Sequence, residues 1–332
     1  MKKRSAPGPG DRARFFAALS RALQGESSLP AALSALSAGE TGLPEAFRPL
    51  ILQAARLGGL GPAMGESGLF SPAQCTLVTL AEGEGRLAAL CPELESDCRR
   101  EERLLSEIQK TAEEVARAGL IMLGVFILLM GIVLPLGIRA LDGLALSLGK
   151  SRPLMPRIVG SGGLGLAAAA LICLAGFLLL FYSRQRGLAV EWSSRLSGGM
   201  RALALKVSAA RFFQGLVLGR AGGLPLREAI YLAAGRIENP LYQQRLARAV
   251  ELLEGGSPFA DAAGEAGLLP KKEQAELDRG LGAEALAFAA FEGALSAVPA
   301  FGAAVEKGLA LWVCAIMGLG VLAAIASLFA LL

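Results

Sequence analysis

Three long apolar runs divide the chain. Residues 119–138, 158–182 and 308–332 contain no Asp, Glu, Lys or Arg. Each run is long enough to cross a bilayer, which takes roughly 20 residues for about 30 Å of hydrocarbon. A single run of this kind fits a buried helix of a soluble protein, but three in one chain of 332 residues do not. We therefore predict transmembrane helices over residues 115–139, 158–182 and 307–332.

The polar regions outside these runs have the apolar spacing of helices. In the first region one helix face carries Phe15, Phe16, Leu19 and Leu23, and in the second it carries Leu241, Val250 and Leu253. Helix starts are indicated where Asn239 precedes Pro240 and Ser257 precedes Pro258. No segment alternates like a strand, so we predict an all-α membrane protein with two antiparallel bundles of five or six helices. Its parts are a flexible tail at 1–10, bundles at 11–114 and 183–306, and a short periplasmic loop at 140–157.

The two bundles are predicted to be copies of one another. Ala13-Arg14-Phe15-Phe16 recurs as Ala210-Arg211-Phe212-Phe213, and Leu29-Pro30 recurs as Leu224-Pro225. Later, the segment at 65–72 (GESGLFSP) matches the segment at 264–270 (GEAGLLP). Three matches in the same order indicate an internal repeat, in which each copy is followed by a span.

The amino-acid composition disfavours several classes of function. Hydrophobic residues make up 53% of the chain and charged residues 19%, compared with about 25% charged residues in soluble domains. Histidine, the commonest general base and metal ligand, is absent. The five cysteines have no metal-binding spacing, and no phosphate-binding or dinucleotide motif is present. The net charge of +4 is not gathered into a basic run, which disfavours nucleic acid as a partner. We expect no enzymatic activity, no cofactor and no metal site.

The spans themselves look suited to helix packing. Small residues are frequent in them, notably at 160–170 and at Gly318 and Gly320, and such residues let helices approach closely in lipid. A small-solute transporter or channel subunit is the alternative, but it would need polar groups at membrane depth. A receptor would need a large domain outside the membrane, whereas the predicted periplasmic segment is short.

Short motifs recur in order around the spans. Each bundle opens with an aromatic pair, Phe15-Phe16 or Phe212-Phe213. The second bundle continues with 222–230 (GGLPLREAI) and 256–262 (GSPFADA). The first carries 82–87 (EGEGRL), whereas the second has 280–286 (GLGAEAL), with leucine in place of the glutamate. In these motifs and in the placement of its spans, nearly the whole chain resembles the type II secretion system protein F family, although Glu84 replaces the serine of the family motif.

This resemblance implies a non-enzymatic platform in the bacterial inner membrane. Such proteins serve type II secretion, type IV pilus or competence pseudopilus machines. It implies partners: a hexameric assembly ATPase, pilin or pseudopilin subunits, other inner-membrane components and further copies of the chain. Both large domains would be cytoplasmic. Positive charges do not decide this topology, because arginines after the second span are matched by basic residues in the loop at 140–157.

The resemblance also selects residues for contact with partners. These candidates are Glu82, Gly85, Arg86, Phe15, Phe16, Phe212 and Phe213. For the phenylalanines the helical spacing favours core packing over docking. For Glu82 a solvated carboxylate is the simpler reading, and for Gly85 a backbone turn. The mixed charges at 95–110 are typical of a solvated face on a helix that continues into the first span.

Overall fold

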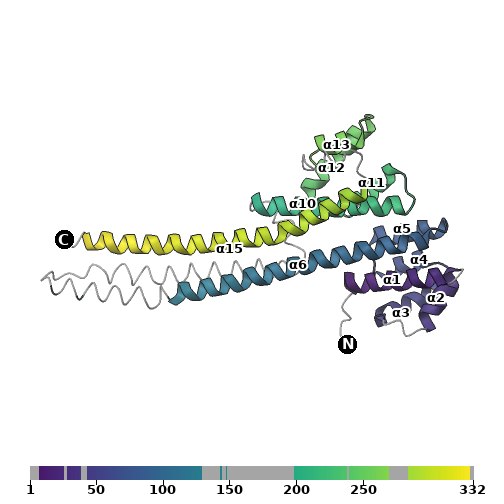
Figure 1. Ribbon diagram of the computed structural model, residues 1–332, viewed down its shortest axis with the longest axis horizontal. Helices are drawn as coiled ribbons and strands as arrows, with labels where there is room; N and C mark the ends of the chain where they lie inside the picture. Colours follow the sequence, from purple (N-terminus) through teal and green to yellow (C-terminus); the bar gives the residue numbers. More distant parts are fainter. Residues whose placement is uncertain are drawn as a thin grey trace. The chain divides into compact units, whose positions relative to one another are not determined.

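The computed structural model describes most of the chain outside the central region: residues 7–25, 28–38, 43–128, 143, 147, 198–237, 239–268 and 283–329. All elements within these ranges are helices, and no strand occurs among them (Figure 1). The predicted all-α class is therefore confirmed. The predicted second span, most of the loop at 140–157 and the whole segment at 269–282 lie outside the described residues.

The first half begins with short helices whose ends follow local chemistry. They are α1 (Pro9–Gly25), α2 (Leu29–Ala38), the 3-10 helix η1 (Glu45–Phe47), α3 (Arg48–Leu57), α4 (Leu60–Ser67) and α5 (Pro72–Gly83). A capping box begins α5, in which Ser71 accepts from the Gln74 N–H and the Gln74 side chain accepts from the Ser71 N–H. Gly58 and Gly68 end α3 and α4 with φ of 69° and 62°, a conformation that disfavours residues with a Cβ.

The described part of the second half begins with a longer helix followed by three shorter ones: α10 (Gly198–Ala221), α11 (Leu226–Ala234), α12 (Pro240–Glu254) and α13 (Phe259–Glu265). Asn239 caps α12 as predicted, since its Oδ1 accepts from the N–H groups of Leu241 and Tyr242. The predicted cap at Ser257 is wrong. Its N–H donates to the Leu252 carbonyl in the turn that ends α12, and α13 begins two residues later without a side-chain cap.

The buried face of α12 also differs slightly from the prediction. Tyr242, Leu246 and Ala249 are its buried residues. Of the predicted residues, Val250 and Leu253 are half-buried and pack against the second core, and Leu241 is half-buried as well. The spacing of four and then three residues from Tyr242 follows the helical period, and Leu253, four residues after Ala249, continues the same face.

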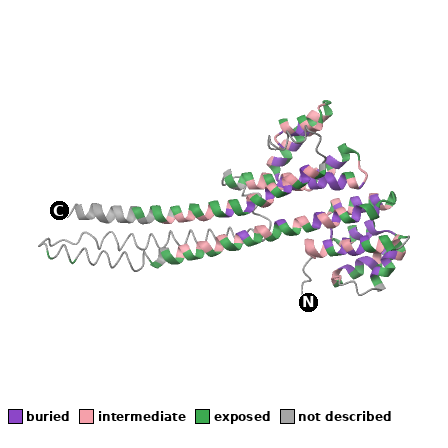
Figure 2. Ribbon diagram, viewed as in Figure 1, coloured by how far each residue is buried: buried purple, intermediate pink, exposed green. Residues whose placement is uncertain are grey.

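Two long helices begin in the apolar cores and extend beyond them. They are α6 (Leu87–Leu128) and α15 (Ala283–Phe329). Figure 2 shows buried residues near the start of each helix and exposed residues farther along. Apart from Leu105, the exposed large apolar residues described in α6 lie in the predicted first span: Leu120, Ile121, Val125 and Leu128. The prediction that the charged helix at 95–110 continues toward that span is confirmed, because α6 is one helix throughout.

Two described helices are long and apolar enough to cross a membrane. Their candidate segments are Arg201–Ala221 in α10 and Glu284–Ala315 in α15. The α10 segment is mostly buried and supplies the core residues Phe212 and Phe213, so it fits a core helix. The α15 segment overlaps the start of the predicted third span. By length and composition alone, α15 is thus compatible with the predicted third span.

The described residues form two compact units. One lies within 1–108 and 194–297, and the other within 109–193 and 298–332. The first unit contains two apolar cores, one built from α1 to α6 and the other from α10 to α13 with the start of α15. Leu218 of α10 is buried in the first core, and Leu224 packs against both cores. The two sequence halves therefore share apolar contact within this unit.

Candidate functional site

The Glu82 side chain forms hydrogen bonds within the first half of the chain. It lies near the end of α5, and its carboxylate accepts hydrogen bonds from the backbone N–H groups of Leu60 and Gly61 at 3.0–3.1 Å. These groups begin α4, whose N-cap residue Gly59 has no side chain that could accept them. The carboxylate also faces the positive end of the helix dipole. Glu82 therefore caps α4 from a distance of 22 residues.

Gly85 forms the turn between α5 and α6. Its φ is +67°, and two backbone bonds close the turn, from Gly85 N–H to Glu82 C=O at 3.2 Å and from Arg86 N–H to Ala81 C=O at 2.8 Å. This bond pattern is a Schellman motif, which favours glycine at the left-handed position. The turn directs Leu87 into the first core, where it is buried.

Arg86 and Glu84 lie on the outside of this turn. They form an exposed ion pair at 3.6 Å. Gly223, which has φ of +91° at the end of α10, lies directly against the pair: a Cβ placed on it would be 2.6 Å from the Glu84 carboxylate. The neighbouring Gly222 lies as closely against Leu77 of α5. Two motifs that the sequence analysis found in different halves are therefore in contact.

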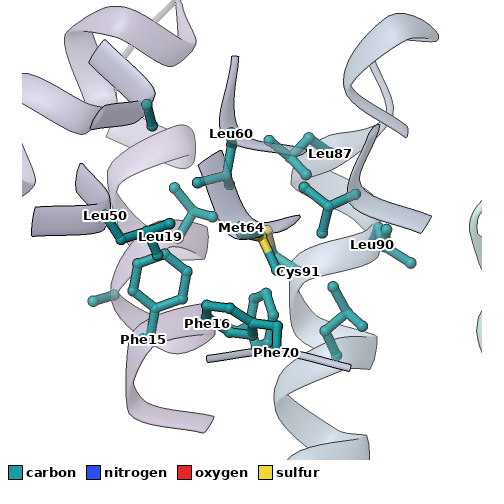
Figure 3. Close-up of a cluster of buried hydrophobic side chains, with 14 of the residues drawn as sticks. Phe15, Phe16, Leu19, Leu50, Leu60, Met64, Phe70, Leu87, Leu90 and Cys91 are labelled. Carbon is teal, nitrogen blue, oxygen red and sulfur yellow. The ribbon is translucent and has the colours of Figure 1, made fainter. Parts of the chain in front are cut away.

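Phe15 and Phe16 are core residues. Both are fully buried, and the rings of Phe15 and Phe47 are stacked with centroids 5.0 Å apart. Phe70 completes the cluster, 5.5 Å from each ring of the pair. Figure 3 shows the pair among side chains of α3, α4 and α6. The core packing favoured by the helical spacing is what the structure has, and neither ring is presented to a partner in this conformation.

Phe212 and Phe213 are likewise core residues, in the second core. Both are fully buried and contact each other edge to face with centroids 5.2 Å apart. Phe212 also contacts Tyr242 of α12, at 6.1 Å between centroids. A direct docking role for these rings would require the core to open.

The most deeply buried ion pair in the described residues joins the two halves. Arg236, in the turn after α11, donates to the Asp97 carboxylate of α6 at 2.8 Å, and their side chains are 15% and 3% exposed. Burial lowers the pKa of Arg236, but the charge of Asp97 and the hydrogen bond outweigh this, so the net pKa is raised. The guanidinium therefore stays protonated, and the pair is ionic.

Sequence reasoning did not single out Asp97 or Arg236. A signal for Asp97 was present, because it follows Leu90 and Leu94 at helical spacing and so lies on the apolar stripe of α6. A carboxylate on such a stripe needs a partner. The neighbouring Glu95 pairs with Arg99 on the solvated side at 2.5 Å, as the predicted charged face requires.

A small cavity lies beside the buried pair. It measures roughly 20 Å³ and is lined by Arg100, Glu101, Leu104, Arg211, Gln214, Arg236 and Phe291. This size suits about one water molecule. Among the described residues, no group of three or more His, Cys, Asp or Glu side chains is placed to hold a metal ion. The cavity is thus a small gap in the packing beside the buried ion pair.

A comparison with known protein families finds a match in the first part of the chain. Residues 15–135 match the family model described as Type II secretion system (T2SS), protein F. This part of the chain is similar to that family. The match begins at the buried Phe15, includes the whole EGEGRL segment and α6, and confirms the resemblance drawn from the motifs over that part of the chain. A search of curated proteins gave no significant match.

Proposed function

We propose that this protein is a non-enzymatic inner-membrane platform that couples a cytoplasmic assembly ATPase to the extraction and polymerisation of pilin or pseudopilin subunits. The single observation that carries the proposal is the family match, because proteins of this family are membrane-associated components of secretion and pilus machines. The matched residues include both the first core and the helix that continues toward the first predicted span.

The proposed layout places both bundles in the cytoplasm, at 11–114 and 183–306, with spans at 115–139, 158–182 and 307–332. Its support is the exposed apolar surface of α6 and the apolar length of α15. Exposed apolar surface along a helix is stable in lipid and unfavourable in water.

We also propose that the bundles are copies of one ancestral unit. Supporting this, Gly68 and Gly267 occupy matching places in the GESGL and GEAGL segments and both have positive φ, 62° and 68°. Each follows a short helix, α4 or α13, and each precedes a leucine that packs into its core. The same backbone device at matching positions is expected of duplicated sequences.

In this proposal the platform binds the hexameric ATPase and neighbouring membrane components through its cytoplasmic bundles. The spans would contact the apolar helices of pilin-like subunits, and oligomerisation of the chain would arrange them around the growing filament. The charge-free spans support lateral packing of this kind over a polar conduction path.

The test is a gene deletion in a strain with one copy of the gene. We expect loss of secretion or surface filaments, restored by the wild-type gene and by a conservative control, the surface variant Glu251→Gln. The purified wild-type protein should also capture the assembly ATPase from the same cells. Normal secretion and normal filaments in the deletion strain would refute the proposal.

A further inference from the structure

The contact between the two halves combines an apolar part with a single buried ion pair. Leu218 enters the first core, and Gly222 lies against Leu77 with no room for a larger side chain. These contacts are close-packed but apolar, so they carry no charge that distinguishes one position along α6 from the next. The Asp97–Arg236 pair is the only ion pair among the described residues that joins the two halves.

The residues around this pair determine which acid of α6 is available to Arg236. Besides Asp97, the acid of α6 that lies next to Arg236 is Glu101, one turn later, which pairs with Arg12 of α1 at 3.5 Å. Arg12 also donates to the side chain of Gln74 in α5 at 3.4 Å. Glu101 is thus paired within the first half, while its charge also helps to raise the pKa of Arg236; Asp97 is the acid to which Arg236 donates its hydrogen bond.

Energetics favours a role in specificity over one in stability. Removing one partner of a buried pair leaves an uncompensated charge and is strongly destabilising. Replacing both partners by apolar residues of similar volume is often neutral or stabilising. Here one oxygen of Asp97 has no hydrogen-bond partner in the described part of the chain, so the pair does not recover its full desolvation cost.

We infer that the Asp97–Arg236 pair is an interlock that fixes the register of the second half on α6. A shift of one helical turn along α6 would bring Arg236 to the already paired Glu101 and leave Asp97 buried without a partner. The charge pattern therefore selects one docking position. Because α6 is the helix that continues toward the first predicted span, the interlock sets how the second half is attached to it. This inference does not depend on the proposed role in secretion.

The experiment uses the full chain in detergent micelles and follows hydrogen exchange of peptides from 226–237. Asp97→Asn should accelerate exchange there by roughly 100-fold or more, because it strands the Arg236 charge. The double variant Asp97→Leu with Arg236→Met should melt within about 4 °C of the wild type yet show two exchanging populations, reflecting more than one register. The control, Glu95→Gln with Arg99→Gln, removes an ion pair on the solvated side of the same helix and should match the wild type.

Two results would overturn the interlock. The first is a double variant that exchanges as one slow population like the wild type, because the register would then be set by apolar packing. The second is a double variant that fails to fold or melts far lower, because the pair would then be needed for stability. If Asp97→Asn itself does not fold, the double variant still decides.

Discussion

The cap that Glu82 provides for α4 makes a quantitative prediction. Glu82→Ala removes the carboxylate that accepts from the N–H groups of Leu60 and Gly61. Loss of an N-cap costs about 1 kcal/mol. Loss of a carboxylate at a helix N-terminus adds about 0.3–1 kcal/mol. Leu60 is fully buried, so water reaches its N–H poorly, and an unsatisfied buried donor costs about 1–3 kcal/mol.

These terms overlap, and together they predict that the free energy of opening α4 falls by about 2–3 kcal/mol. Native-state hydrogen exchange of the full chain measures this quantity directly from amides inside α4. Exchange there should become roughly 25- to 140-fold faster. Glu82→Gln should lie between the variant and the wild type, because its amide oxygen still accepts but carries no charge.

The matched control is Glu102→Ala, which removes an exposed carboxylate from α6 of the same bundle. It should change opening of α4 by less than about 0.5 kcal/mol. Exchange in Glu82→Ala within twofold of the wild type would refute the capping role. Glu82 would then be available as the partner-contact residue that the family resemblance suggests.

Three further predictions concern the cores. Phe15→Ala removes a ring packed against Phe16, Phe47 and Phe70 and should cost about 3–5 kcal/mol in unfolding free energy; a loss below 1 kcal/mol would contradict the packing. Tyr242→Phe should leave the melting temperature unchanged or raise it, since the buried hydroxyl has no hydrogen-bond partner in the described structure; a clear drop would show a missing partner. Burial raises the pKa of the Cys91 thiol to about 12. Alkylation of Cys91, measured by peptide mapping, should therefore be slow from pH 7 to pH 9 and become fast only in denaturant.

Local chemistry made much of the fold predictable. Helical spacing placed Phe15, Phe16 and Leu19 on one face, and all three are fully buried. Asn239 before Pro240 located the start of α12, because a cap and its helix are adjacent in sequence. The prediction failed at Ser257, where the same signal was overridden by the turn that closes around Gly256 at φ of 88°. Ser257 could belong to the turn that ends α12 or cap the helix that follows, and sequence spacing alone does not distinguish these two roles.

The chain's pattern by itself thus determined an all-helical protein, its apolar stripes and its turn glycines, since these depend on neighbours within a few residues. Tertiary structure alone decided what Glu82 and Asp97 do. One carboxylate caps a helix 22 residues away, and the other holds an arginine 139 residues away. A carboxylate accepts from a backbone N–H or a guanidinium equally well, so only the position of the donor in the folded chain distinguishes a solvated charge from a cap or an interlock.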